Sequence, residues 1–174
     1  RLTQLNEQLQ NAQASSNSDA VTPPTDEEQQ EIRRIQAMIQ NSPDLINAVG
    51  GGERGLRTPL QQAAEKGQLV IAKYLLDHGA SVDVKAGASS TPLSLAADNG
   101  HKAMVELLLA RGADPNGAGG PVPLCQAASH GFTGVAEVLL ANKADVNLFS
   151  ETDTRNLRPA HIAARDDKTE LLKL

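Results

Sequence analysis

Hydrophobic and polar residues follow the period of an α-helix through most of this chain, and two kinds of short helical segment alternate. One kind is rich in alanine, as in QQAAEK and LSLAAD. The other carries a broad apolar stripe, as in VIAKYLLD and AMVELLLA. Such a stripe is wider than a single surface helix exposes, so neighbouring helices must cover it. The pattern predicts stacked pairs of short helices.

The alanine-rich helix of each pair opens a repeated motif. Its four copies are TPLQQAAEKG from Thr58, TPLSLAADNG from Thr91, VPLCQAASHG from Val122 and RPAHIAARDD from Arg158. Their starts are separated by 33 residues (58 to 91), 31 (91 to 122) and 36 (122 to 158). A regular period of this length indicates a repeat architecture, in which each unit buries its apolar face against the next.

Each part of the motif suits one end of a short helix. The proline stands in the first turn, where its missing N–H leaves no acceptor unsatisfied. Thr58 and Thr91 are predicted N-caps. The paired alanines keep the helix thin, and Gly67, Gly100 and Gly131 end it in a backbone conformation with positive φ.

These residues resemble the ankyrin repeat, which has a period of about 33 residues and a T-P-L-H-x-A signature. The resemblance implies an all-α solenoid of helix-turn-helix repeats joined by β-hairpin loops. In that family the signature histidine tethers neighbouring turns by hydrogen bonds, and here His161 alone stands at its place. Gln61, Ser94 and Cys125 replace it in the other copies, so we expect the tether to be weaker there or rebuilt.

The motif also sets the expected boundaries. Upstream of the first copy, residues 32–39 are spaced like the second helix of a repeat, and Thr25 with Glu28 forms a predicted capping box. We predict a coiled-coil tail in residues 1–12, a linker in 13–24, an N-terminal capping half-repeat with a long hairpin in 25–57, ankyrin repeats in 58–90, 91–121 and 122–157, the last with an extended finger, and an incomplete fourth repeat in 158–174.

Both ends of the chain carry leucines that invite self-association. Leu2, Leu5 and Leu9 lie three or four residues apart, as in a coiled coil. The leucines of residues 171–174 would leave an apolar edge, so either further repeats follow or this end packs against another chain. The chain begins with Arg1 rather than methionine, which indicates a piece of a longer protein.

One glycine-rich stretch offers a competing interpretation. Gly50, Gly52 and Gly55 fit the G-x-G-x-x-G pattern of a dinucleotide-binding turn, and Asp77 lies 22 positions beyond Gly55. That turn needs a β-strand before the glycines and a βαβ unit around them. Here the glycines follow a predicted helix and lead into a Thr-Pro helix start, so we predict the tip of an inter-repeat hairpin and expect no cofactor.

The charge and cysteine content narrow the class of partner. A net charge of -5, without a long basic run, argues against nucleic-acid or membrane binding by the repeats. The single cysteine excludes an intrachain disulfide and favours a reducing compartment, so we expect an intracellular protein, cytoplasmic or nuclear. Aromatic residues make up 2% of the chain, so the core must be built from aliphatic residues, as suits thin layers of helices.

Residues able to carry chemistry have structural explanations. His78, His101, His130 and His161 recur near helix ends or in the signature place. Cys125 with His130 lacks a third orienting group for nucleophilic catalysis, and no Cys/His pair has zinc-ligand spacing. We therefore predict no enzyme activity, no metal and no cofactor, with Cys125 as a small buried core residue.

Asp83, Asn116 and Asn147 occupy equivalent positions in the hairpin loops. Short polar side chains in loops commonly bond the local backbone, and we expect that here. Ankyrin asparagines at this place can be substrates of an oxygen-dependent asparaginyl hydroxylase, which the resemblance allows for Asn116 and Asn147.

The resemblance also implies where a partner binds. In ankyrin arrays, partners lie along the concave face formed by the hairpin tips and first helices. Mapping that face onto this chain selects the residues that the repeat itself does not dictate. These candidates are Arg57, Glu65, Lys66, Lys85, Ser90, Asp98, Asn99, Ser129, His130, Phe149, Glu151, Arg165 and Asp166. Each of them taken singly has an ordinary solvated residue as its alternative, because fewer than about a third of interface residues carry binding energy.

The last hairpin loop departs from the repeat. LFSETDTRNLR is longer than its counterparts and carries Phe149, which we predict to be a binding anchor unless it folds back over the neighbouring repeat. Lys143 replaces the glycine that ends the second helix elsewhere, so we expect a strained or mobile turn.

The sequence thus predicts a non-catalytic protein-protein interaction module whose partner is another protein of unknown identity. An alternative comes from the leucines of residues 1–12. If they continue a basic zipper upstream, the chain is the regulatory ankyrin segment of a dimeric transcription factor, similar to fungal basic-zipper proteins with ankyrin tails.

Overall fold

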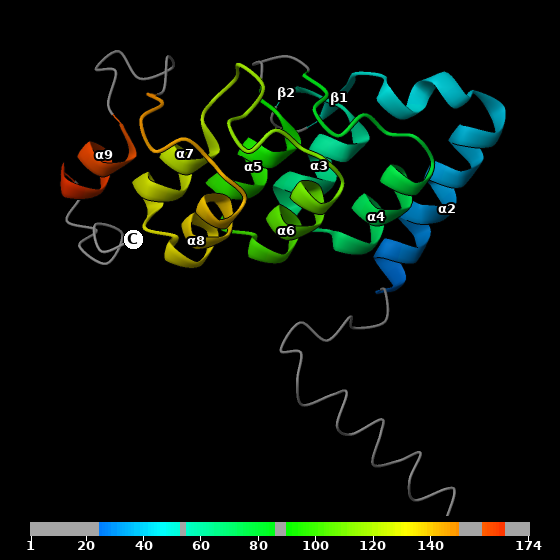
Figure 1. Cartoon of the computed structure of the whole chain (residues 1–174). Coiled ribbons are helices and arrows are strands. Elements are labelled where there is room, and N and C mark those ends of the chain that lie inside the picture. Colours follow the sequence, from blue (N-terminus) through cyan, green and yellow to red (C-terminus); the bar gives the residue numbers. More distant parts are fainter. Residues whose placement is uncertain (1–24, 53–54, 86–89, 150–157, 166–174) are drawn as a thin grey trace, which may run out of the picture.

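The structure is a computed structural model that describes residues 25–52, 55–85, 90–149 and 158–165. Its helices form two parallel rows (Figure 1). The inner row holds the first helix of each repeat: α3 (Pro59–Lys66), α5 (Pro92–Asp98), α7 (Pro123–His130) and α9 (Pro159–Arg165). The outer row holds α2 (Asp26–Asn41), α4 (Leu69–Asp77), α6 (Lys102–Ala110) and α8 (Thr133–Ala141).

Contacts follow the repeat order. Along the inner row α3 packs on α5, α5 on α7 and α7 on α9, while in the outer row α2 packs on α4, α4 on α6 and α6 on α8. The inner helices α3, α5 and α7 also pack on the outer helices that follow them in the chain, α4, α6 and α8. The predicted all-α ankyrin-type solenoid is confirmed.

The helix ends follow the short-range signals in the sequence. Thr58 Oγ1 accepts a hydrogen bond from the Gln61 backbone N at 3.3 Å, and Gln61 Oε1 accepts one from the Thr58 N at 2.9 Å. Thr25 and Glu28 form the same reciprocal box at the start of α2. Gly67 ends α3 with φ 71°, so the predicted left-handed cap is confirmed.

Leucine and alanine form the core between the two rows. Leu60, Leu75, Leu93, Leu108 and Leu139 are completely buried. The paired alanines of α3, α5 and α7 are buried as well, which lets successive inner helices approach closely. Truncating one such leucine to alanine costs about 2–5 kcal/mol, since the helices around it are held in place by their neighbours.

At two glycines, a ring from the next repeat packs into the space that a Cβ atom would occupy. A Cβ atom on Gly67 would lie 2.8 Å from His101 Nδ1, and one on Gly100 would lie 2.9 Å from the Phe132 ring. His101 Nε2 also lies 3.1 Å from the Glu65 carbonyl oxygen near the end of α3. These rings therefore pack the turn of one repeat onto the turn of the previous repeat.

The glycine-rich stretch forms a hairpin. The 3-10 helix η1 (Pro43–Asn47) leads into β1 (Gly50–Gly52), which pairs antiparallel with β2 (Gly55–Arg57) in the register Gly50 to Arg57. A dinucleotide turn needs a strand followed by a helix, and here a strand is followed by a second strand. The predicted inter-repeat hairpin is confirmed.

Lys143 adopts φ 67°, a left-handed conformation that Gly79 and Gly112 provide at the equivalent turns of earlier repeats. The strain predicted at this turn is confirmed, because an L-residue with a Cβ pays a steric penalty there.

Candidate partner-binding surface

The hairpin loops are joined by side chains that reach from one repeat to the next. Asn116 Oδ1 accepts a hydrogen bond from the Asp145 backbone N at 2.8 Å. The Asp83 carboxylate accepts one from the Asp114 backbone N at 3.2 Å to each oxygen. In the first half-repeat, Asn47 Oδ1 accepts from a backbone N–H of the next repeat in the same way.

Our expectation that Asp83, Asn116 and Asn147 bond the local backbone was wrong. The local backbone bonds are made by Asp114 and Asp145, whose Oδ1 atoms accept from the N–H groups of Asn116 and Asn147. The residue two positions further on is thus left to bond the neighbouring loop, which stacking brings within reach. Asn147 Oδ1 likewise lies 3.5 Å from Nη1 of Arg158, beyond the finger.

The histidine tether is rebuilt in the first repeat. Gln61 Nε2 donates to the carbonyl oxygens of Ser90 at 2.6 Å and Val84 at 3.3 Å. Both acceptors lie in the loop that leads to the second repeat. The buried glutamine therefore makes the hydrogen bonds between neighbouring turns that the signature histidine makes in the family.

The residues at the signature histidine position in the other repeats make different contacts from Gln61. Ser94 Oγ donates to the Thr91 carbonyl oxygen within its own helix start. Cys125 is buried, as predicted, and its Sγ lies 3.8 Å from the Leu148 carbonyl oxygen. His161 is exposed on α9.

Several predicted partner-binding residues are engaged within the fold. Arg57 Nε and Glu65 Oε2 lie 3.6 Å apart, with side chains only 13% and 15% exposed. At that distance the two groups form an ion pair rather than a hydrogen bond. Because both side chains are largely buried, the pair holds the start of the inner face together and leaves little charge accessible to a partner. The Ser90 carbonyl oxygen is taken by the first-repeat tether, and Asn99 Nδ2 donates to the Leu95 carbonyl oxygen.

Three of the predicted partner-binding residues lie together where α5 and α7 end. His130 Nδ1 lies 3.6 Å from Asp98 Oδ1 and 3.1 Å from Ser129 Oγ. The His130 ring stacks on the Phe132 ring with centroids 5.5 Å apart. The structure therefore brings together Asp98, Ser129 and His130, which the sequence could only place one by one.

Three predicted residues project freely. Lys66 and Lys85 are exposed and form no ion pair among the described residues. The Phe149 side chain is 43% exposed. Glu151 and Asp166, and the side chain of Arg165, lie outside what the structure describes, as do the leucines of residues 171–174.

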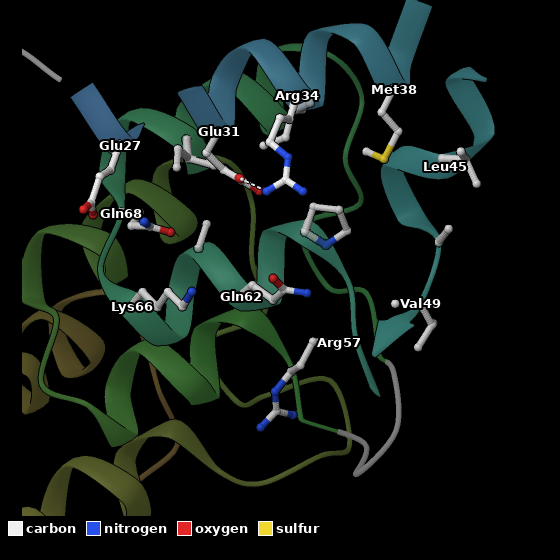
Figure 2. A pocket seen from close by; sticks show the side chains of 16 residues that line it. Glu27, Glu31, Arg34, Met38, Leu45, Val49, Arg57, Gln62, Lys66 and Gln68 are labelled. Carbon is white, nitrogen blue, oxygen red and sulfur yellow. Dashed lines mark hydrogen bonds and ion pairs between the residues drawn. The ribbon is translucent and has the colours of Figure 1, made fainter. Parts of the chain in front are cut away.

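The sequence did not reveal a groove between α2 and α3. It encloses about 780 Å³ and is lined by the following residues: Glu27, Glu31, Arg34, Ile35, Met38, Leu45, Ala48, Val49, Gly50, Arg57, Pro59, Gln62, Ala63, Lys66, Gln68 and Ile71. Figure 2 shows Arg34 and Met38 pointing from α2 toward α3, where Gln62 lies. The signal that would have revealed it is the absence of a T-P-L motif before α2, since among the described residues no inner helix covers that side of α3.

The remaining histidine, His78, packs within its own repeat. His78 stacks on Tyr74 with ring centroids 4.0 Å apart, and its Nδ1 lies 2.8 Å from the Tyr74 carbonyl oxygen. Across the described ranges, no group of three or more His, Cys, Asp or Glu side chains is arranged to hold a metal ion.

A family profile of ankyrin repeats in three copies matches residues 34–118. Residues 34–118 thus carry ankyrin repeats. Ankyrin repeats generally act as protein-protein interaction modules without catalysis. The matched residues begin inside α2 and include the hairpin, α3 to α6 and the loop after α6.

Relatives share the repeats over part of their length. The chain is 47% identical over 82 residues to zygote-specific protein 3 of Chlamydomonas reinhardtii, covering 47% of this chain and 19% of that protein. It is 48% identical over 59 residues to the 26S proteasome non-ATPase regulatory subunit 10 of Dictyostelium discoideum, covering 33% and 25%. It is 47% identical over 58 residues to human ankyrin repeat domain-containing protein 17, covering 32% and 2%. The chain thus spans a quarter or less of these relatives.

None of the helices in the described part of the chain has both the length and the apolar character needed to cross a membrane.

Proposed function

We propose that this chain binds a partner protein through its inner face, meaning the exposed residues of α3, α5 and α7 and the hairpin loops beside them. Neither catalysis nor a cofactor enters this function. The partner's identity is not encoded in the scaffold, because repeat proteins share a core and differ in surface.

One observation carries the proposal: the buried alanine pair is identical in three successive inner helices, whereas the two positions that follow it differ in each. The buried pair of alanines recurs unchanged in α3, α5 and α7. The next two positions read Glu65-Lys66, then Asp98-Asn99, then Ser129-His130. Packing dictates the alanines, whereas the residue types of the last turn differ in each of these three repeats, so that turn can be selected for a partner.

The exposed side chains on this face indicate what chemical groups a partner should present. Lys66 and Lys85 present two exposed ammonium groups that form no ion pair with the described residues, and Phe149 presents an apolar ring on the last loop. Buried aromatic anchors dominate interface energy, while exposed charges mainly set the association rate and specificity. We therefore propose a partner with an acidic segment that reaches the lysines and an apolar pocket for Phe149.

The test compares inner-face and outer-row variants in quantitative affinity capture from cells that contain the protein. Lys66→Glu with Lys85→Glu, and separately Phe149→Ala, should each lose the same partner. Lys73→Glu with Lys102→Glu makes the same charge change on α4 and α6 and should retain it. The proposal is rejected if the partner stays bound to both inner-face variants, or if the outer-row pair loses it while its melting temperature is unchanged.

The alternative function, a regulatory segment of a dimeric basic-zipper factor, rests on Leu2, Leu5 and Leu9, which lie outside the described residues. It requires that the intact chain is a dimer by sedimentation and that Leu5→Gln with Leu9→Gln converts it to a monomer. A monomeric native chain removes the support that these leucines give it.

A further inference from the structure

The inner row of helices starts one helix later than the outer row. α2 packs on α4 and so occupies an outer place, yet within the described residues no inner helix precedes α3. In the other repeats this place is filled, since α5 packs on α3 and α7 packs on α5. The groove between α2 and α3 therefore lies where the inner helix of a preceding repeat would stack (Figure 2).

The uncovered face of α3 can be compared with its covered counterpart on α5. Pro92 of α5 and Pro123 of α7, whose helices each pack on a preceding inner helix, are buried. The equivalent residue of α3, Pro59, is half-buried and lines the groove. The same position of the repeat is thus buried in α5 and α7 and more open in α3.

The groove has the composition of an unfinished helix-packing site. Leu45 and Val49 line it with side chains 42% and 47% exposed, and both rank among the few large hydrophobic residues exposed in the described ranges. Met38 adds a thioether that adapts to a partner surface. Charged groups of both signs, including Glu31 and Arg34, stand on its rim (Figure 2). An apolar floor with a mixed rim suits an amphipathic helix of low net charge.

We propose that residues 2–12 of this chain occupy the groove as a helix and complete the N-terminal half-repeat. Connectivity favours them, because they precede α2 just as α3 precedes α4 and α5 precedes α6. As a helix they would place Leu2, Leu5 and Leu9 on one side, and eleven residues would extend for about 16 Å. The eight-residue α3 extends for about 12 Å, so the segment is long enough to cover it.

The linker permits this docking and favours it over a separate partner. Residues 13–24 span at most about 40 Å when extended and about 20 Å on average as a flexible chain. α2 is about 24 Å long, so either end of the groove is within reach of Thr25. A tether of this length keeps the segment at an effective concentration in the millimolar range, so even weak affinity fills the groove. The segment has one charged side chain, Glu7, which Arg1 just before it balances, so its net charge is low, as suits the mixed rim.

The two methionines of the chain allow a direct test on the intact 174-residue chain. Met38 lines the groove and Met104 is 1% exposed in the core, so methyl-labelled methionine gives one reporter for the groove and one for the fold. The measurement is the relaxation of each methyl signal by a soluble paramagnetic agent. In the native chain the Met38 methyl should be protected. In Leu5→Gln with Leu9→Gln its relaxation should rise several-fold while Met104 is unchanged.

Gln4→Ala with Asn11→Ala alters the opposite side of the same predicted helix and should leave Met38 as protected as in the native chain. Equal relaxation of Met38 in the native and leucine-substituted chains overturns the proposal. So does protection that depends on protein concentration together with a dimeric mass, because the segment then pairs with a second copy, as the coiled-coil interpretation requires.

Discussion

Asn116 Oδ1 accepts the backbone N–H of Asp145, a residue 29 positions further along the chain, at 2.8 Å. With the equivalent bonds from Asn47 and Asp83, it forms a series of side-chain acceptors that runs along the hairpin loops. Each bond joins two successive repeats at the edge from which the inner face is presented. The position of one loop therefore depends on the one before it.

Removing this acceptor should loosen the junction measurably. Asn116→Ala leaves the Asp145 N–H to water and should lower the free energy of unfolding by about 0.5–1.5 kcal/mol. Asn116→Asp keeps an oxygen in place, as Asp83 does naturally, and should stay within about 0.5 kcal/mol of the native protein. Urea unfolding followed by circular dichroism measures both. A loss in Asn116→Asp equal to that in Asn116→Ala would show that the amide acts through something other than this bond.

Gln61 should be more sensitive, because it is completely buried and makes both a local and a long-range set of bonds. Gln61→Ala leaves the Thr58 N–H and the Ser90 carbonyl oxygen without their partner, for a loss of about 2–4 kcal/mol. Gln61→Glu retains an acceptor for Thr58 but removes the donor to Ser90, so its stability should also fall. Gln62→Ala, on the half-buried neighbour, is the matched control and should cost much less. Chemical denaturation midpoints at constant m-value provide the comparison.

Two glycines with similar backbone conformations should respond differently to alanine. Gly100 and Gly112 have φ of 73° and 87°, so alanine is strained at both by about 1–2 kcal/mol. Only at Gly100 would the new Cβ meet the Phe132 ring, at 2.9 Å, whereas at Gly112 no atom lies within 4 Å. Gly100→Ala should therefore be the less stable variant by thermal melting. Equal melting temperatures would mean that the ring moves aside freely.

Lys143 offers the opposite change. Its φ of 67° disfavours any side chain, and glycine occupies the equivalent turn in the two preceding repeats. Lys143→Gly should raise the free energy of unfolding by up to about 1 kcal/mol, since relief of strain outweighs the greater freedom of glycine in the unfolded chain. Lys143→Ala keeps the strain while removing the charge, so it should not stabilise. Differential scanning calorimetry distinguishes the two.

The sequence by itself determined the helix caps and turns, because these depend on residues only three or four positions apart. The N-cap of Thr58 and the capping box of Thr25 need only a side chain and a backbone N–H three positions away, and both are present as predicted. The left-handed turn at Gly67 follows from local sterics, because glycine has no Cβ, whereas the repeat imposes the same conformation on Lys143. The repeat itself is visible because each local pattern recurs at a regular spacing, so the solenoid follows from the sequence.

Only the tertiary structure decided which groups meet across repeats. The acceptor of Gln61 and the donor to Asn116 each lie 29 residues away, and no residue type at those places marks a backbone group as a partner. The same holds for the contact of His130 with Asp98, and for the groove beside α3, which exists because α2 stands in the outer row. Stacking geometry selects these partners, since any backbone N–H or carbonyl brought to the right place serves equally well.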